Sequence, residues 1–334
     1  MVPNPPFIAS AAAVALVSLA YAGRAHAASG CEMHMVASIP AKLSARNQLL
    51  VAATIDDTPV AIQIDTGAQS STLSKKFALR MGMPIEDTAG VVYGLTGEAL
   101  SQRTRIRSLR LGSTVSSNEA MPLTPIGGDG TTADPVALFG SDYLQNYDVE
   151  IDVAGGKVNL FSPDHCPGQV VYWAPEYFKS SIYYVGNSPL HRPTMDIAVD
   201  GKPLRALIDT GAFATVMRLA VARDRFDLSP GSAALQKLGE TKGIEGRMLE
   251  TYQHTFQSMT FGAITLHNTR MVVAPIDTAA RVASIGSHLN RDMGEQPDVL
   301  IGMSLLKQLH LLIAYSESEL YYTIGTTPQQ AAPQ

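Results

Sequence analysis

The chain has 334 residues, of which 46% are hydrophobic and 16% are charged, and its formal net charge is −5 at pH 7. A chain of this length and composition can bury a substantial core and is expected to form two domains or one large two-lobed unit. No run of basic residues occurs in it, and phosphate binding requires clustered lysine and arginine. The composition therefore argues against a nucleic-acid partner.

The N-terminus carries a short apolar run over residues 7–20, followed by Ala25-His26-Ala27. This order resembles a secretory signal peptide over residues 1–27, cleaved after Ala27, although no lysine or arginine precedes the apolar run. An uncleaved membrane anchor, the alternative, would need a longer apolar segment to span a bilayer. We therefore expect an exported protein, periplasmic or secreted from a bacterium, whose mature chain has no integral membrane span.

The two cysteines of the chain are Cys31 and Cys166. In an exported protein an even pair predicts a disulfide, and two unpaired thiols are the alternative. Residues 28–31 also faintly resemble a lipoprotein cleavage box, but alanine stands where leucine is usual, so lipoprotein anchoring is not expected.

Cys31 lies near Met33, His34 and Met35, which are soft ligands of the kind that bind copper. We interpret this cluster as incidental, since Cys31 is expected to be bonded, and predict neither a metal nor another cofactor. The zinc motif H-E-x-x-H and the nucleophile motif G-x-S-x-G are both missing from the sequence. The glycines of residues 127–130 lack phosphate-loop spacing and predict a surface loop, and residues 277–279 predict a turn.

An internal repeat organises the rest of the chain. Residues 54–68 align without a gap on residues 198–212, and both segments end in Asp-Thr-Gly-Ala. Each copy predicts a hairpin in which a short strand, a turn rich in Asp, Gly and Pro, and a second apolar strand lead to the motif. The similarity continues downstream, where Leu-Phe-Gly at 138–140 corresponds to Leu-Ile-Gly at 300–302. A short helix and a further hairpin are expected after each of these tripeptides.

The repeat predicts a mostly β protein of two homologous lobes, with about a dozen additional residues in the second copy, near 280–296. The first lobe is expected over residues 28–162 and the second over 194–325. Residues 163–193 would join them. The tail over residues 326–334 is rich in Pro, Gln and Ala and is expected to be disordered.

Two Asp-Thr-Gly-Ala motifs at matched positions, each followed by an apolar-apolar-Gly segment, resemble the pattern of the retropepsin-like aspartic proteases. The resemblance covers residues 45–325 and implies two retropepsin-like β-barrel lobes fused in one chain, with the bilobal plan of pepsin. It implies that Asp65 and Asp209 are the catalytic pair. Two carboxylates in contact share one proton, so one can activate water as a base while the other hydrogen-bonds the substrate carbonyl. No covalent intermediate is expected.

The resemblance also assigns supporting roles around the pair. Gly67 and Gly211 would let the backbone approach closely, and Gly140 and Gly302 would allow tight packing behind the catalytic loops. The hydroxyls of Thr66 and Thr210 would hydrogen-bond across the lobe interface, and Ser71 and Thr215 would stabilise their loops. The full set of expected supporting residues is Thr66, Gly67, Ala68, Ser71, Thr210, Gly211, Ala212 and Thr215.

Two glycine-containing hairpins resemble the flaps that fold over substrate, and ordinary hairpins are the alternative. Leu95 and Ile244 would be the tip residues that touch the substrate. The expected flap residues are Tyr93, Gly94, Leu95, Thr96 and Gly97 in the first lobe, and Gly243, Ile244, Glu245 and Gly246 in the second.

The sequence therefore predicts an exported aspartic endopeptidase acting on polypeptides. The alternative is a catalytically silent, protease-like protein of the cell envelope that binds peptides or serves as a scaffold. Pairing of the two lobes within a monomer is favoured over a domain-swapped or other homodimer, because the lobes differ at the flap and in the insertion.

Overall fold

The computed structural model describes residues 32–93, 99–125, 127–184, 191–242, 248–276 and 296–325. The first half contains β1 (Met35–Leu43), β2 (Leu49–Ile55), β3 (Thr58–Ile64), β4 (Thr72–Ser74), α1 (Lys75–Arg80), β5 (Ile85–Tyr93), β6 (Ala99–Leu111), β7 (Thr114–Thr124), β8 (Ala137–Phe139), α2 (Ser141–Leu144), β9 (Asp148–Asp152), β10 (Lys157–Phe161) and β11 (Phe178–Ser181). The second half contains β12 (Thr194–Val199), β13 (Lys202–Ile208), β14 (Val216–Arg218), α3 (Leu219–Phe226), β15 (Gln236–Lys242), β16 (Met248–Phe261), β17 (Ile264–Ala274), β18 (Val299–Ile301), α4 (Met303–Leu306), β19 (Leu309–Ala314) and β20 (Glu319–Ile324).

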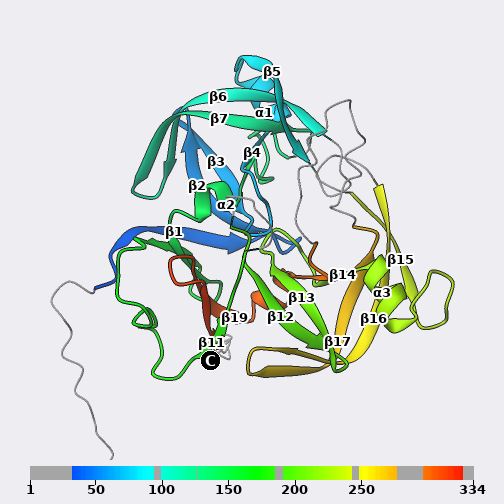
Figure 1. Ribbon diagram of the computed structural model, residues 1–334. Coiled ribbons are helices and arrows are strands. Elements are labelled where there is room, and N and C mark those ends of the chain that lie inside the picture. Colours follow the sequence, from blue (N-terminus) through cyan, green and yellow to red (C-terminus); the bar gives the residue numbers. More distant parts are fainter. Residues whose placement is uncertain are drawn as a thin grey trace, which may run out of the picture.

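Each half forms a closed barrel, and the two barrels lie side by side (Figure 1). The first has the strand order β2-β3-β8-β4-β7-β6 and closes through β2 and β6, while β5 pairs with the outside of β6. The second has the order β12-β13-β18-β14-β17-β16, closes through β12 and β16, and carries β15 on β16. Strand order and closure are the same in both, so the predicted two-lobed, mostly β fold is confirmed.

The predicted repeat hairpins are β2–β3 and β12–β13. Their turns need left-handed backbone conformations, with φ of 46° at Asp56 and 46° at Asp200, which aspartate tolerates better than most residues. Both side chains also hydrogen-bond the barrel. Asp56 Oδ1 accepts the backbone N–H of Ser108 at 2.9 Å, and Asp200 Oδ1 accepts that of Ser258 at 2.8 Å. The aspartates repeated in the sequence thus join each hairpin to the long β6 or β16 strand.

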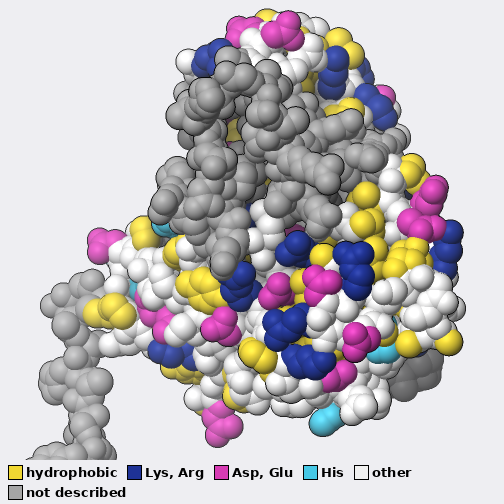
Figure 2. Space-filling model, turned by 45° about the vertical axis from the view of Figure 1, so that its right-hand side comes forward, with side chains coloured by type: hydrophobic (Ala, Val, Ile, Leu, Met, Phe, Trp, Pro, Cys, Tyr) yellow, Lys and Arg dark blue, Asp and Glu magenta, His cyan; other side chains and the backbone are white. Residues whose placement is uncertain are grey.

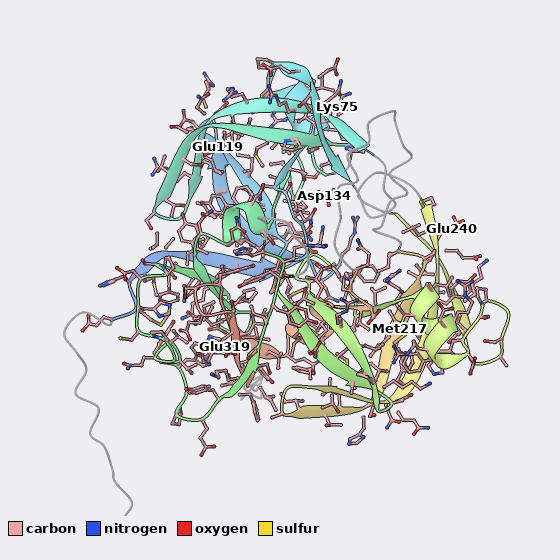
Figure 3. All side chains as sticks on the ribbon, in the orientation of Figure 1. Lys75, Glu119, Asp134, Met217, Glu240 and Glu319 are labelled. Carbon is pink, nitrogen blue, oxygen red and sulfur yellow. The ribbon has the colours of Figure 1, made fainter. Side chains whose placement is uncertain are left out.

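Buried apolar side chains fill both barrels, and Figure 3 labels one of them, Met217 of the second barrel. Ile62 and Ile64 of β3 are fully buried in the first, and Met217 of β14 and Val299 of β18 are fully buried in the second. Each such side chain contributes about 1.5–3 kcal/mol on leaving water. β3 ends at one Asp-Thr-Gly-Ala segment, and β18 pairs with β13, which ends at the other, so core packing holds the strand ends from which those loops emerge.

A third sheet joins the lobes and was not anticipated from the sequence. The predicted downstream hairpins are present as β9–β10 and β19–β20, but they lie outside the barrels in the order β11-β20-β19-β9-β10-β1. Antiparallel pairing of β9 with β19 joins the two halves of the chain. The connecting segment also contributes, because β11 forms an edge of this sheet.

No helix among the described residues is long and apolar enough to cross a membrane.

Buried charges lie between the two halves in this sheet. Glu150 of β9 is fully buried, and its carboxylate receives hydrogen bonds from His310 Nε2 at 2.6 Å, Tyr172 Oη at 2.6 Å and Asn159 Nδ2 at 2.8 Å. Burial alone would raise the pKa of Glu150, but these hydrogen bonds outweigh it and lower that pKa. Trp173 stacks on His310 with ring centroids 4.2 Å apart.

Asp148 lies in a second polar cluster of the sheet. It is fully buried, contacts His165 Nε2, and accepts the Ser316 hydroxyl at 2.7 Å. His165 Nδ1 is 3.6 Å from Glu317 Oε1. Burial alone would lower the pKa of His165, but the hydrogen bond to Asp148 outweighs it and raises that pKa. The side chain of His165 therefore links the first half of the chain to the turn after β19.

We predict that this cluster makes stability depend on pH. The pKa of His165 is raised in the folded state, so its contribution is complete below the unfolded pKa of about 6.5 and is lost as pH rises through the folded value. The midpoint of thermal unfolding should fall by about 2–4 °C per kcal/mol lost across that range. His165→Gln should remove this part of the pH dependence. His267→Gln, at an exposed position on β17, is the control. Identical profiles for wild type and His165→Gln would contradict the assignment.

Candidate active site

Asp65 and Asp209 stand at the ends of two equivalent strands. Asp65 follows β3 and donates its backbone N–H to Phe139 O at 2.9 Å; Asp209 follows β13 and donates to Ile301 O at 3.0 Å. β3 pairs in parallel with β8, and β13 with β18. The apolar-apolar-Gly segments singled out in the sequence are therefore the strands that anchor the two aspartates.

The structure brings the two carboxyl groups into direct contact. The side chains of Asp65 and Asp209 hydrogen-bond each other, and the residues retain only 9% and 7% of their exposure. Asp65 Oδ1 accepts the N–H groups of Gly67 at 3.0 Å and Ala68 at 2.9 Å. Asp209 Oδ1 accepts those of Gly211 at 2.9 Å and Ala212 at 3.1 Å. Each loop thus orients its aspartate so that the remaining carboxyl edges face each other.

Four hydrogen bonds between Thr66 and Thr210 and the opposite loops hold the lobes in register. Thr66 N donates to Thr210 Oγ1 at 3.0 Å, and Thr210 N donates to Thr66 Oγ1 at 3.1 Å. The Thr66 hydroxyl donates to Ile208 O at 2.6 Å, and the Thr210 hydroxyl donates to Ile64 O at 2.8 Å. Both threonines are fully buried. The predicted bonding across the lobe interface is confirmed, and every donor in this set is satisfied inside the protein.

Gly67 and Gly211 are required by close approach. A Cβ atom on Gly67 would lie 2.3 Å from Asp209 Cγ, and one on Gly211 would lie 2.1 Å from Asp65 Cγ. Each glycine therefore makes room for the aspartate of the other lobe. Behind the loops, a Cβ on Gly140 would meet Ala68 O at 2.9 Å, and one on Gly302 would meet Ala214 O at 2.1 Å. The predicted tight packing at these positions is confirmed.

Ser71 and Thr215 hold their loops through matched contacts that leave the aspartates untouched. Ser71 Oγ accepts the N–H of Gly140 at 3.0 Å and donates to Asp142 at 2.6 Å. Thr215 Oγ1 accepts the N–H of Gly302 at 3.3 Å and lies 3.5 Å from Ser304 Oγ. Asp142 and Ser304 occupy equivalent positions of the internal repeat, and both accept the backbone N–H of the residue they support.

The surroundings of the pair favour one shared proton. Burial, followed by the charge of Asp209, raises the pKa of Asp65 well above its usual value. Burial also raises the pKa of Asp209, against the lowering effects of its hydrogen bonds and of Arg192. Two carboxylates in contact cannot both ionise at low cost, so the pair titrates as a unit. The two carboxyl groups therefore share one proton, and the nearby charge of Arg192 acts on Asp209 to favour its ionised form.

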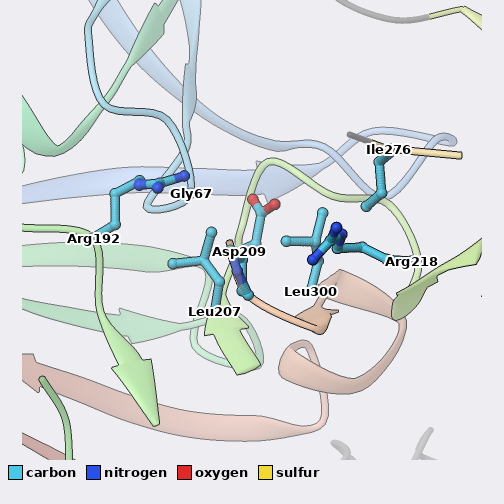
Figure 4. A pocket seen from close by; sticks show the side chains of 8 residues that line it. Gly67, Arg192, Leu207, Asp209, Arg218, Ile276 and Leu300 are labelled. Carbon is cyan, nitrogen blue, oxygen red and sulfur yellow. The ribbon is translucent and has the colours of Figure 1, made fainter. Parts of the chain in front are cut away.

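Arg192 is the residue near the pair that sequence reasoning missed, because it lies at the end of the segment interpreted as a connection between lobes. Its pKa is lowered by burial, which the charges of Asp209 and Asp65 partly offset. Figure 4 shows it facing Asp209 across a pocket also lined by Gly67, Leu207, Arg218, Ile276, Pro297 and Leu300. A lone arginine in a segment without a motif gives no sequence signal.

The expected flaps lie mostly outside the described residues. β5 ends at Tyr93 and β6 begins at Ala99, which pairs with it; Lys242 and Met248 pair in the same way in the second lobe. The two hairpins are therefore confirmed. Their tips, which contain Gly94, Leu95, Thr96, Gly97, Gly243, Ile244, Glu245 and Gly246, fall outside the described part of the chain.

Three further expectations also fall outside the described part. Cys31 is not among the described residues, so its pairing with Cys166 stays a prediction, as do the signal peptide and the disordered tail. Among the residues that are described, no group of three or more His, Cys, Asp or Glu side chains could hold a metal ion.

Comparison with known proteins agrees with this geometry. The model of a family described as aspartyl protease matches residues 51–143 and 195–305, which together make up more than half of the chain. Each matched stretch contains one Asp-Thr-Gly-Ala motif with its supporting strands. A search of curated protein sequences finds no match.

The glycine contacts generate a prediction for Gly211→Ala. The new Cβ would overlap Asp65, so the carboxyl pair should separate, and any activity that depends on it should fall roughly 10²-fold or more. Gly231→Ala is the control: φ there is 90° and no atom lies within 4 Å, so this change should cost about 1 kcal/mol of stability and leave activity intact. Measuring kcat/KM and thermal unfolding of both variants separates the two effects, and a fully active Gly211→Ala would contradict the contact.

Proposed function

The chain belongs to the aspartyl protease family, and from this premise we propose that it is an endopeptidase that hydrolyses peptide bonds with water activated between Asp65 and Asp209. The observation that carries the proposal is the buried hydrogen-bonded pair of carboxyl groups, each oriented by its own loop and locked to the other by Thr66 and Thr210. Both halves of the pair come from one chain.

Each carboxyl group has a distinct role in the proposed reaction. Asp209 carries the negative charge and takes a proton from the attacking water, while protonated Asp65 donates a hydrogen bond to the substrate carbonyl oxygen. The water oxygen forms a bond to the carbonyl carbon while Asp65 passes its proton to the carbonyl oxygen, which gives a tetrahedral diol. The diol collapses when its C–N bond breaks: the amine leaves with the proton that Asp209 took from water, and one hydroxyl of the diol returns a proton to Asp65. The water attacks directly, so the protein forms no covalent intermediate.

A catalytically silent protein that binds peptides with the same fold is the alternative. The intact motifs, the matched glycine contacts and the shared proton favour turnover, because a binding cleft alone requires none of them. Cleavage and binding can be separated by incubating an unfolded protein such as casein with the chain between pH 3 and 7, with and without pepstatin. Binding without any cleavage over that range would favour the alternative.

We predict that Asp65→Asn and Asp209→Asn each lower kcat/KM at least about 10³-fold, because each removes one member of the acid–base pair. Activity of the wild type should fall as pH rises through the raised pKa of Asp65, because the hydrogen-bond donor is then lost. Full activity in either variant would refute the shared pair.

Stability provides the control for these variants. The raised pKa of Asp65 gives stability that is complete below its unfolded value of about 3.9 and is lost as pH rises through the folded value. The amide introduced by Asp65→Asn cannot ionise, so this variant should unfold at a higher temperature than the wild type at pH 7, by about 2–4 °C per kcal/mol, and at the same temperature near pH 3. If Asp65→Asn loses activity but unfolds at this higher temperature, misfolding is not the cause of the lost activity.

We further propose that the chain is exported to the periplasm or secreted, that it is cleaved after Ala27, and that it works as a monomer with Cys31 bonded to Cys166. The apolar run before Ala27 and the even pair of cysteines support this. N-terminal sequencing of the mature protein should begin at Ala28, and its intact mass should rise by two hydrogens on reduction. A cytoplasmic protein that retains residues 1–27 would contradict the proposal.

A further inference from the structure

A pocket opens beside Asp209 on the second-lobe side of the carboxyl pair. The space that it encloses, about 310 Å³, is partly open to solvent, so the pocket is a shallow recess that suits a small group such as the carboxylate of one side chain or chain end. Arg192 and Arg218 line it together with the apolar Leu207, Ile276 and Leu300. Figure 4 shows the two arginines on either side of Asp209.

Arg192 has unused capacity to bind an anion. A guanidinium carries five N–H donors in a planar fork that matches a carboxylate. Within the residues that the structure describes, no hydrogen bond or salt bridge engages the guanidinium of Arg192, and the charges that act on it are those of Asp209 and Asp65. The group is partly buried, so its charge is less screened by water than that of a surface arginine.

Arg218 is fixed in the opposite wall by its backbone. It is the last residue of β14, pairs in parallel with Ala274 of β17, and donates its N–H to Asp298 O at 3.0 Å. Arg192 lies in the segment before β12 and Arg218 ends β14, so the fold brings the two arginines together beside Asp209 from separate parts of the second half.

The first lobe has no arginine at the two positions equivalent to Arg192 and Arg218. With the offset of 144 residues between the repeats, Gln48 corresponds to Arg192 and Ser74 to Arg218. Gln48 is already engaged, since its Nε2 donates to Gln63 Oε1 at 3.0 Å. The pseudo-twofold arrangement of the lobes should place two subsites symmetrically about the scissile bond, and arginine occupies these two positions in the second lobe but neither of them in the first.

We infer that this pocket binds a carboxylate of the peptide substrate on one side of the scissile bond, so that the protease selects acidic or C-terminal residues there. The inference rests on the proposed function and specifies its substrate class. The apolar side chains would contact the methylene groups, and the arginines would bind the carboxylate. On the face in Figure 2, acidic and basic side chains are intermixed, so a general surface field does not account for such a preference.

The experiment measures cleavage of paired peptides at pH 5, where glutamate is largely ionised. Each pair carries Glu or Gln at one of the four positions on either side of the scissile bond, and a second set compares a free C-terminal carboxylate with its amide. A charge-assisted hydrogen bond contributes about 1.5–3 kcal/mol, so the wild type should prefer the carboxylate roughly 10-fold or more at one position. Preference for Glu would identify a side chain as the source, and preference for the free acid would identify the chain end.

Arg192→Met should reduce this ratio of kcat/KM toward 1, and Arg192→Lys should restore part of it because the charge returns without the planar fork. Arg218→Met should act in the same direction. Arg223→Met, on the exposed face of α3, should keep the wild-type ratio. No carboxylate preference at any position in the wild type, or an unchanged ratio in Arg192→Met, would overturn the inference.

Peptide binding to Asp65→Asn protein, followed by fluorescence anisotropy, separates this inference from the proposed function. Tighter binding of the carboxylate peptide, lost on adding Arg192→Met, supports the pocket even if the wild type cleaves nothing. Equal binding of the two peptides to Asp65→Asn would count against the pocket even if the wild type is an active protease.

Discussion

The close approach of two backbone loops is the constraint on which the rest of the structure depends. Gly67 can lie against Asp209, and Gly211 against Asp65, only because neither glycine has a side chain. Two carboxyl groups this close share a proton, and in the proposed reaction this makes one of two identical residues the donor and the other the base. The hydrogen bonds of Thr66 and Thr210 fix the separation and are shielded from water, so they do not compete with solvent.

Everything around the loops acts to hold this geometry. The parallel strands β8 and β18 anchor the two aspartates, and matched hydroxyls close each loop from behind. The sheet that joins the lobes then limits their relative motion, because β9 and β19 pair directly. Burying the carboxylates of this sheet costs free energy of desolvation, which hydrogen bonds from several donors offset. Removing a single donor would leave part of that free energy uncompensated.

The lobes, their hairpins and the catalytic loops could be predicted because each depends on local residues that occur twice. Aspartate and glycine indicate the turns, apolar runs indicate the strands, and the repeated Asp-Thr-Gly-Ala indicates the two catalytic loops. The sheet between the lobes could not be predicted, since β9 and β19 have the pattern of ordinary hairpin strands and their pairing joins residues about 160 apart. Arg192 was missed for a related reason: its importance comes from the pocket it faces, and the residues around it form no motif.

The order of strands in the joining sheet has a consequence for synthesis. β1 follows the predicted export signal, and β20 ends at Ile324, yet both belong to the same sheet. Asp209 and its anchoring strand β18 also come late in the chain. The first lobe is synthesised first, but it holds only half of the carboxyl pair. A chain built in this way cannot assemble its carboxyl pair until nearly its whole length has been synthesised.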